Sequence, residues 1–100
     1  MKYSLIFSDE AQHDIIESIR WYNEQKENLG FELYDRLTNK LSLLSDNPLH
    51  YSIRFENIRA SKVSHYPYLI YFKINDKNSS LIILGVLHTS RDPKTISKRK

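Results

Sequence analysis

Two stretches in the first half of the chain carry apolar residues at helical spacing. Between residues 9 and 26 they recur every three or four positions, with Ile16 beside them: Ala11, Ile15, Ile19 and Tyr22. Between residues 31 and 46 the same spacing links Phe31, Tyr34, Leu37, Leu41 and Leu44. Each pattern predicts an amphipathic helix. Ser8 or Asp9 is a suitable N-cap for the first helix. The short Asn28-Leu29-Gly30 segment predicts a helix stop and an antiparallel hairpin.

The remaining apolar stretches have the composition of β-strands. Tyr3, Leu5 and Phe7 fall on one face of a first strand by alternation. Residues 51–64 predict a second strand interrupted at Glu56-Asn57, and residues 68–74 predict a third. Residues 81–87 are the most apolar stretch, which predicts a buried central strand. Gly85 within it indicates a bulge or a close backbone approach.

The predicted order is therefore β-α-α-β-β-β, an α+β fold. A two-helix hairpin packs on one face of a mostly antiparallel sheet of three or four strands. Residues 88–100 predict a loop with a short helix or a frayed tail, which includes Lys98-Arg99-Lys100. The residues that we expect to be buried are Ile15, Ile19, Leu37, Leu41, Ile70, Phe72, Ile83 and Val86.

Composition favours one domain over residues 1–100. A chain of 100 residues with 40% hydrophobic and 27% charged residues is typical of a small globular domain. The absence of cysteine excludes disulfides and thiolate metal sites and suits a reducing compartment. No apolar run approaches the roughly 20 residues that span a bilayer, and no signal peptide is recognisable. We expect a cytoplasmic protein that does not engage a membrane.

Charge is unevenly distributed along the chain. Residues 1–46 contain nine acidic and five basic residues, a net charge of −4. Residues 47–100 contain ten basic and three acidic residues, a net charge of +7. This asymmetry predicts a basic surface that attracts phosphates or an acidic protein partner. The plainer interpretation is two solvated faces and a basic tail.

Little in the sequence points to a metal or cofactor. His13 and Glu17 are four residues apart on the first predicted helix, but no further ligand accompanies them, so a solvated pair is the better interpretation. No phosphate-binding glycine motif and no nucleophile elbow is present. We therefore expect no cofactor and no metal.

Metal-independent RNA cleavage is the one enzymatic chemistry that the residue types allow. It requires a base for the 2′-hydroxyl, an acid for the leaving oxygen and a cation for the phosphorane. The alternative for these polar residues is structural: His88 hydrogen-bonded at a strand end, and arginines paired with Glu56 and Asp92. The candidate catalytic residues are Arg59, Lys62, His65, Tyr71, His88 and Arg91.

A set of ordered landmarks covers residues 7–93. In order they are Phe7 with Ala11, Asp14 and Ile15; Trp21-Tyr22; Leu29-Gly30; Phe31 with Leu37; Asn47-Pro48; Ile58-Arg59; Tyr66-Pro67-Tyr68 with Ile70-Tyr71; and His88 with Arg91-Asp92-Pro93. No single landmark is specific, but the set with its element order resembles the RelE/ParE superfamily. These proteins are the toxins of bacterial type II toxin–antitoxin pairs.

The ending of the chain resembles the ParE-like branch. RelE-like nucleases typically carry a dense Lys/Arg cluster on the sheet and a Tyr or His-Tyr near the C-terminus, whereas this chain has no tyrosine after Tyr71. The resemblance implies a toxin that is not an enzyme and that blocks a host target, DNA gyrase, with Arg59, Lys62, His88 and Arg91 as target-binding candidates. The alternatives are a RelE-like ribosome-dependent mRNA endoribonuclease and a non-toxic binding protein with this fold.

The resemblance also implies a cognate antitoxin as partner, in a toxin–antitoxin hetero-oligomer. The antitoxin segment is expected to be disordered alone and to fold on binding. A groove beside the helix hairpin and an edge strand, residues 51–55 or the first strand, are the expected surfaces. Trp21 lies off the apolar stripe and is a candidate interface anchor.

Overall fold

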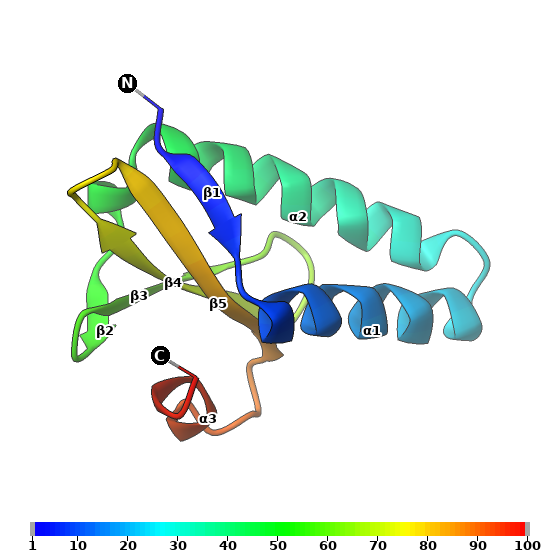
Figure 1. Cartoon of the computed structure of the whole chain (residues 1–100). Coiled ribbons are helices and arrows are strands. Elements are labelled where there is room, and N and C mark those ends of the chain that lie inside the picture. The colour runs from blue at the N-terminus through cyan, green and yellow to red at the C-terminus, as the bar shows by residue number, and fades with distance from the viewer. Residues whose placement is uncertain (1, 100) are drawn as a thin grey trace.

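The computed structural model describes residues 2–99. Figure 1 shows two long helices that run antiparallel from a turn at one end of the molecule, with a twisted sheet beside their other ends. In chain order the elements are β1 (Ser4–Phe7), α1 (Asp9–Gln25), α2 (Leu29–Asp46), the 3₁₀ turn η1 (Pro48–His50), β2 (Ile53–Phe55), β3 (Ile58–Lys62), β4 (Tyr68–Asn75), β5 (Ser80–His88) and α3 (Lys94–Ser97).

The start of α1 follows from local chemistry. The Ser8 hydroxyl accepts a hydrogen bond from the Ala11 amide at 3.1 Å, which caps the helix as expected. Asp9 and Glu10 occupy the first turn, where carboxylates complement the helix dipole.

Within the predicted stop segment Asn28-Leu29-Gly30, the turn is made by Asn28 and not by Gly30. The first helix ends at Gln25, and Asn28 makes the turn with a left-handed φ of 68°. Gly30 lies in the first turn of α2, where an added Cβ would lie 2.2 Å from the Ile19 carbonyl oxygen. Its amide donates to Asn23 Oδ1 at 2.7 Å. The glycine therefore allows the two helices to approach closely.

The sheet has five strands in the order β1-β5-β4-β3-β2. Strand β1 pairs in parallel with β5, and the other neighbours are antiparallel. The strand expected over residues 51–64 divides at Glu56, where φ is 53°, into β2 and β3, so the sheet is wider than the three or four strands predicted. As expected, β5 is internal, and β1 and β2 are the edges.

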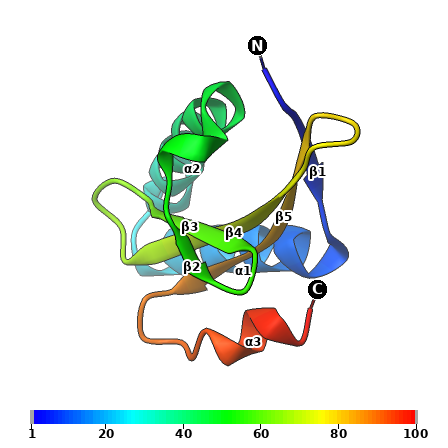
Figure 2. The same ribbon diagram turned by 90° about the vertical axis from the view of Figure 1, so that its left-hand side faces the viewer.

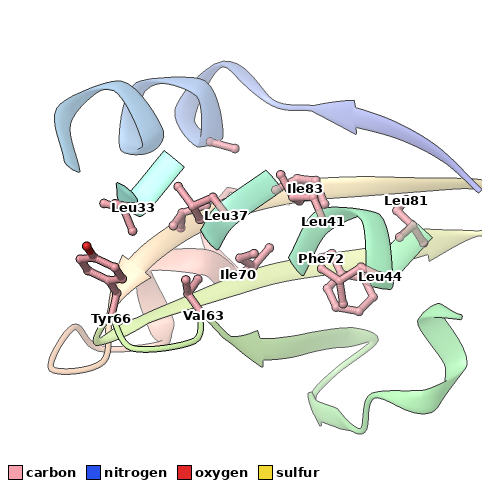
Figure 3. Packing of buried hydrophobic residues seen from close by; sticks show 12 residues of the cluster. Leu33, Leu37, Leu41, Leu44, Val63, Tyr66, Ile70, Phe72, Leu81 and Ile83 are labelled. Carbon is pink, nitrogen blue, oxygen red and sulfur yellow. The ribbon is translucent and has the colours of Figure 1, made fainter. Parts of the chain in front are cut away.

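The main core lies between the helix hairpin and one face of the sheet. Figure 3 shows leucines of α2 directed at the sheet side chains Ile70, Phe72 and Ile83. Leu41 and Ile83 are both buried, as are the other sheet positions predicted, whereas Ile15 and Ile19 are only partly buried. The buried members are Ala11, Leu33, Leu37, Leu41, Leu44, Val63, Tyr66, Ile70, Phe72, Leu81, Ile83 and Val86.

A second apolar cluster covers the opposite face of the sheet. Figure 2 shows α3 on the side of the sheet away from α2. Ile96 of α3 is fully buried there with Ile58, Ala60, Tyr71, Leu84 and Leu87. Because β5 is covered on both faces, it is apolar along its length and does not alternate.

The bulge expected at Gly85 is present. Tyr71 is opposite Gly85 and Phe72 is opposite Ile83, so Leu84 is the extra residue in β5. An added Cβ at Gly85 would lie 2.6 Å from Arg99 Nη1 and 2.7 Å from Ile96 Cδ1. The position therefore combines a bulge with the close approach of the C-terminal segment.

Candidate functional site

The helix hairpin presents an apolar flank to solvent. Phe31 and Tyr34 have the spacing of the α2 core stripe, yet they are 60% and 50% exposed. The helix that their spacing predicts is confirmed, but nothing within residues 2–99 covers that side of α2. Two hollows continue the surface: one lies along Ile16, Ile19 and Asn23 of α1, and one lies between α2 and Leu5 and Phe7 of β1. We call Ile16, Ile19, Phe31, Tyr34, Leu5 and Phe7 the hairpin flank.

Both edges of the sheet carry exposed aliphatic side chains. Ile6 of β1 and Ile53 of β2 are about half exposed. Strand β2 is short and its register with β3 shifts between Ile53 and Phe55. Short and irregular edges discourage uncontrolled strand addition, but they leave backbone groups available to a specific partner.

A cleft of about 390 Å³ lies between α1 and the ends of β4 and β5. We call it the strand-end cleft. One wall carries Glu17, Trp21 and Glu24 of α1, and the other carries His88 and Arg91, with Tyr68 between them. Trp21 is half exposed, as its place off the apolar stripe suggests. Tyr68 makes edge contacts with both Tyr22 and His88, at 6.1 and 5.7 Å between ring centroids.

The hydrogen bonds of His88 fix its tautomer. The Ser90 amide donates to His88 Nδ1 at 3.1 Å, so Nδ1 must accept and the ring proton lies on Nε2. The Ser90 hydroxyl lies 2.8 Å from the same nitrogen. The ring therefore presents Nε2–H as a donor at the end of β5. This agrees with the structural interpretation of His88, which places it in local hydrogen bonds at a strand end.

A buried ion pair borders the cleft, which Asp14 lines. Asp14 of α1 and Arg99, 85 residues apart, are in contact at 2.6 Å, with side chains only 11% and 14% exposed. Asp14 also accepts from the Val86 amide, and Arg99 donates to the Leu84 carbonyl oxygen. The expected frayed tail is therefore wrong at Arg99. This residue links α1 to the bulge of β5, which precedes His88.

The other candidate catalytic residues lie outside the cleft. Arg59 pairs with Phe72 across the sheet, shares the helix-facing side and donates to the Tyr51 carbonyl oxygen at 2.6 Å. Lys62 follows Ile58 and Ala60 by alternation onto the opposite face, and its ammonium donates to the Val63 and Tyr66 carbonyl oxygens. Arg59, Lys62 and Arg91 therefore do not line one continuous basic surface.

His65 and Tyr71 are separated as well. His65 occupies the β3–β4 loop with a left-handed φ of 69° and contacts the Ser64 hydroxyl. Tyr71 is buried beneath α3, and burial raises the pKa of its hydroxyl, with nearby Arg54 opposing the shift. A buried phenol with a raised pKa is a poor base. Of the six candidates, His88 and Arg91 line the strand-end cleft together.

Residues 2–99 contain no group of three or more potential metal-ligating side chains. None of the helices in that part of the chain has both the length and the apolar character required to cross a bilayer.

Comparison with known proteins identifies the family. Residues 5–93 match the family model of the ParE toxin of type II toxin–antitoxin systems, parDE. This chain belongs to the ParE toxin family. Comparison with curated proteins found no relative by sequence.

Solved structures share the ParE-family fold. The chromosomal ParDE toxin–antitoxin system from P. aeruginosa aligns with a TM-score of 0.75 and 12% identity, over 87% of this chain and 96% of that one. The isolated E. coli RelE toxin aligns with a TM-score of 0.68 and 16% identity, over 96% and 94%. The intact E. coli RelBE complex aligns with a TM-score of 0.68 and 17% identity, over 89% of this chain and 99% of that one. At such identities the likeness shows the fold alone.

By family and fold, the chain is thus the toxin of a type II toxin–antitoxin system. The family match ends at Pro93 and does not include Arg99, which holds α3 against the sheet. Sequence reasoning did not find the Asp14–Arg99 pair. The one available signal was the presence of Asp14 among the family landmarks.

Proposed function

We propose that this ParE-family chain is a growth-inhibiting toxin that acts by binding a host protein, DNA gyrase, in the cytoplasm. The observation that carries the proposal is the dispersal of the candidate nuclease residues. RNA cleavage needs a base, an acid and a cation within hydrogen-bond reach of one phosphate. Here Arg59 and Lys62 serve backbone carbonyls on opposite faces of the sheet, and Tyr71 is buried. Such an arrangement favours binding over catalysis.

Inducible expression in bacteria tests this target. A gyrase inhibitor relaxes plasmid DNA before protein synthesis falls, because supercoiling is the first activity lost. Topoisomer distribution and incorporation of labelled amino acid, followed in the same culture, separate the two orders of events. Loss of protein synthesis with unchanged plasmid topology would contradict gyrase as the target. Unaffected growth at high expression would support the non-toxic alternative.

We further propose that a cognate antitoxin neutralises the toxin by covering the hairpin flank and one sheet edge. The flank is apolar and unpartnered in the isolated chain, which suits an amphipathic helix. An extended antitoxin segment would add a strand at β1 or β2. Both surfaces together would exceed the roughly 1,600 Å² of a standard interface.

Hydrogen exchange on the free and bound toxin tests the mode of neutralisation. We expect slower exchange in α1, in α2 and in one edge strand on binding. Overall stability should also rise, because a partner that binds only the folded state stabilises it by mass action. Protection confined to the C-terminal residues would exclude this mode.

A RelE-like endoribonuclease is the second candidate, and one observation favours it. The Nε2–H of His88 is available as a hydrogen-bond donor in the same cleft as the Arg91 guanidinium. These groups would stabilise the charge of the phosphorane if the ribosome supplied the base and the acid. Cell-free translation with primer extension would then show mRNA cleavage that is lost in both His88→Gln and Arg91→Gln.

A further inference from the structure

The strand-end cleft carries charges of both signs. Glu17, Arg20 and Glu24 lie on the α1 wall, and Arg91 lies beyond the end of β5. Within residues 2–99 no ion pair crosses the cleft; Glu17 pairs along its own helix with Arg20 at 2.9 Å, and neither Glu24 nor Arg91 has an ion-pair partner. Such exposed pairs along a helix are weak and are readily exchanged for a ligand.

Aromatic side chains form a floor between these walls. Trp21 is one turn from Glu17 and less than one turn from Glu24, so the indole lies between the two carboxylates along the helix. Tyr68 and the His88 imidazole continue the floor toward Arg91. An aromatic ring flanked by carboxylates is a receptor for an arginine or lysine side chain, through cation–π attraction and charge-assisted hydrogen bonds.

The same charges disfavour a nucleic acid. A phosphate backbone entering the cleft would meet Arg20 and Arg91 but would also face Glu17 and Glu24, with Asp14 already neutralised by Arg99, so positive charge does not predominate. Binding of nucleic acid relies on a groove in which positive charge predominates. A protein segment can instead offer both signs at once.

We propose that the strand-end cleft binds a mixed-charge segment of a partner protein. An arginine of that segment stacks on Trp21 between Glu17 and Glu24, and a neighbouring acidic side chain pairs with Arg91. The cleft adjoins the hollow of the hairpin flank, and Arg20 and Glu24 line both. Trp21, Tyr68, His88 and Arg91 line the cleft and lie outside the flank. Its occupant is therefore the host target. This assignment rests on the proposed function, but the chemistry of the cleft does not depend on it.

The single tryptophan of the chain makes the test direct. The indole N–H of Trp21 gives one side-chain cross-peak in a ¹H–¹⁵N spectrum of the uniformly labelled protein. The probe is the peptide Ac-Gly-Arg-Gly-Glu-Gly-NH2, titrated to millimolar concentration at low salt. We expect a saturable shift of the indole peak together with the amides of residues 88–91. The glutamine-substituted peptide Ac-Gly-Gln-Gly-Gln-Gly-NH2 and a dT10 oligonucleotide should leave these peaks in place.

Variants assign the two charges separately. Glu17→Gln/Glu24→Gln and Arg91→Gln should each weaken peptide binding roughly two- to tenfold, as expected for exposed cation–π and ion-pair contacts. Glu27→Gln removes a negative charge near the helix turn but outside the cleft, and it should bind like the unmodified protein. All four surface changes are compatible with folding, which the dispersion of the amide spectrum verifies.

Two outcomes would overturn the inference. One is a saturable shift with dT10 that exceeds the shift with the peptide, which would make the cleft a nucleic-acid site. The other is the absence of any shift with the peptide, or an equal loss of binding in Glu27→Gln. Neither outcome depends on gyrase, so a negative supercoiling assay with positive peptide binding would refute the target and leave the cleft assignment standing.

Discussion

The buried Asp14–Arg99 ion pair should contribute strongly to the stability of this fold, and replacing Arg99 by Met tests that expectation. Methionine keeps much of the length and apolar stem of arginine but removes the charge and the donors. Asp14 would then remain at a site that is 11% exposed, with only the Val86 amide as a hydrogen-bond donor. The Leu84 carbonyl oxygen would lose the guanidinium as well.

The size of the loss follows from burial. Removing one partner of a fully buried pair costs about 3–5 kcal/mol. Because both side chains retain slight exposure and the chain end can adjust, we expect Arg99→Met to cost about 2–4 kcal/mol. In a domain of this size that loss corresponds to a Tm lower by roughly 10–20 °C. Asp14→Asn should cost less, about 1–2 kcal/mol, because the amide oxygen can still accept from Val86 and Arg99 can turn toward solvent.

Urea denaturation followed by far-UV circular dichroism measures these values. Lys98→Met is the matched control, because it removes the same charge from an exposed neighbour and should fall within about 0.5 kcal/mol of the unmodified protein. The double variant Asp14→Asn/Arg99→Met should lose less than the sum of the single losses, since the two side chains interact. Equal stability of Arg99→Met and Lys98→Met would show that the ion pair does not stabilise the fold.

Three further predictions concern packing, pH and partner binding. Gly85→Ala should lower the free energy of unfolding by about 1–3 kcal/mol in the same assay, because its Cβ would overlap Ile96 and the Arg99 guanidinium; an unchanged midpoint would mean that α3 shifts without cost. Burial raises the pKa of Tyr71, so the unfolded chain loses that proton first and stability should fall as pH rises above about 10; Tyr71→Phe should show a shallower decline between pH 9 and 11, and an identical decline would contradict this. Phe31→Ser should weaken antitoxin binding at least about tenfold by calorimetry while leaving Tm within a few degrees, since its side chain is mostly exposed.

The sequence pattern predicted the helices and strands because apolar positions recur with the period of each element. The helix hairpin, the strand at residues 81–87 and its bulge at Gly85 follow from periodicity and from glycine chemistry. Periodicity shows which residues are apolar but not which are covered. Phe31 and Tyr34, for example, share the helical spacing of the core leucines, yet they form an exposed flank.

Contacts between distant residues were beyond the reach of those patterns. Asp14 and Arg99 are 85 residues apart, and each alone looks like a solvated charge. The candidate site was also chosen by residue chemistry, whereas strand register decides which side chains meet. Register and alternation place Arg59 and Lys62 on opposite faces, and the end of β5 brings His88 and Arg91 to the same cleft.

The most direct test of the account is a supercoiling assay with purified DNA gyrase, relaxed plasmid and ATP. We expect the purified chain to inhibit supercoiling in a concentration-dependent manner, and we expect an equimolar amount of cognate antitoxin to restore it. The same preparation should leave cell-free translation and the integrity of its mRNA unchanged. Full supercoiling in the presence of excess toxin, together with cleaved mRNA in the translation reaction, would contradict a gyrase-directed ParE-like toxin and favour the endoribonuclease.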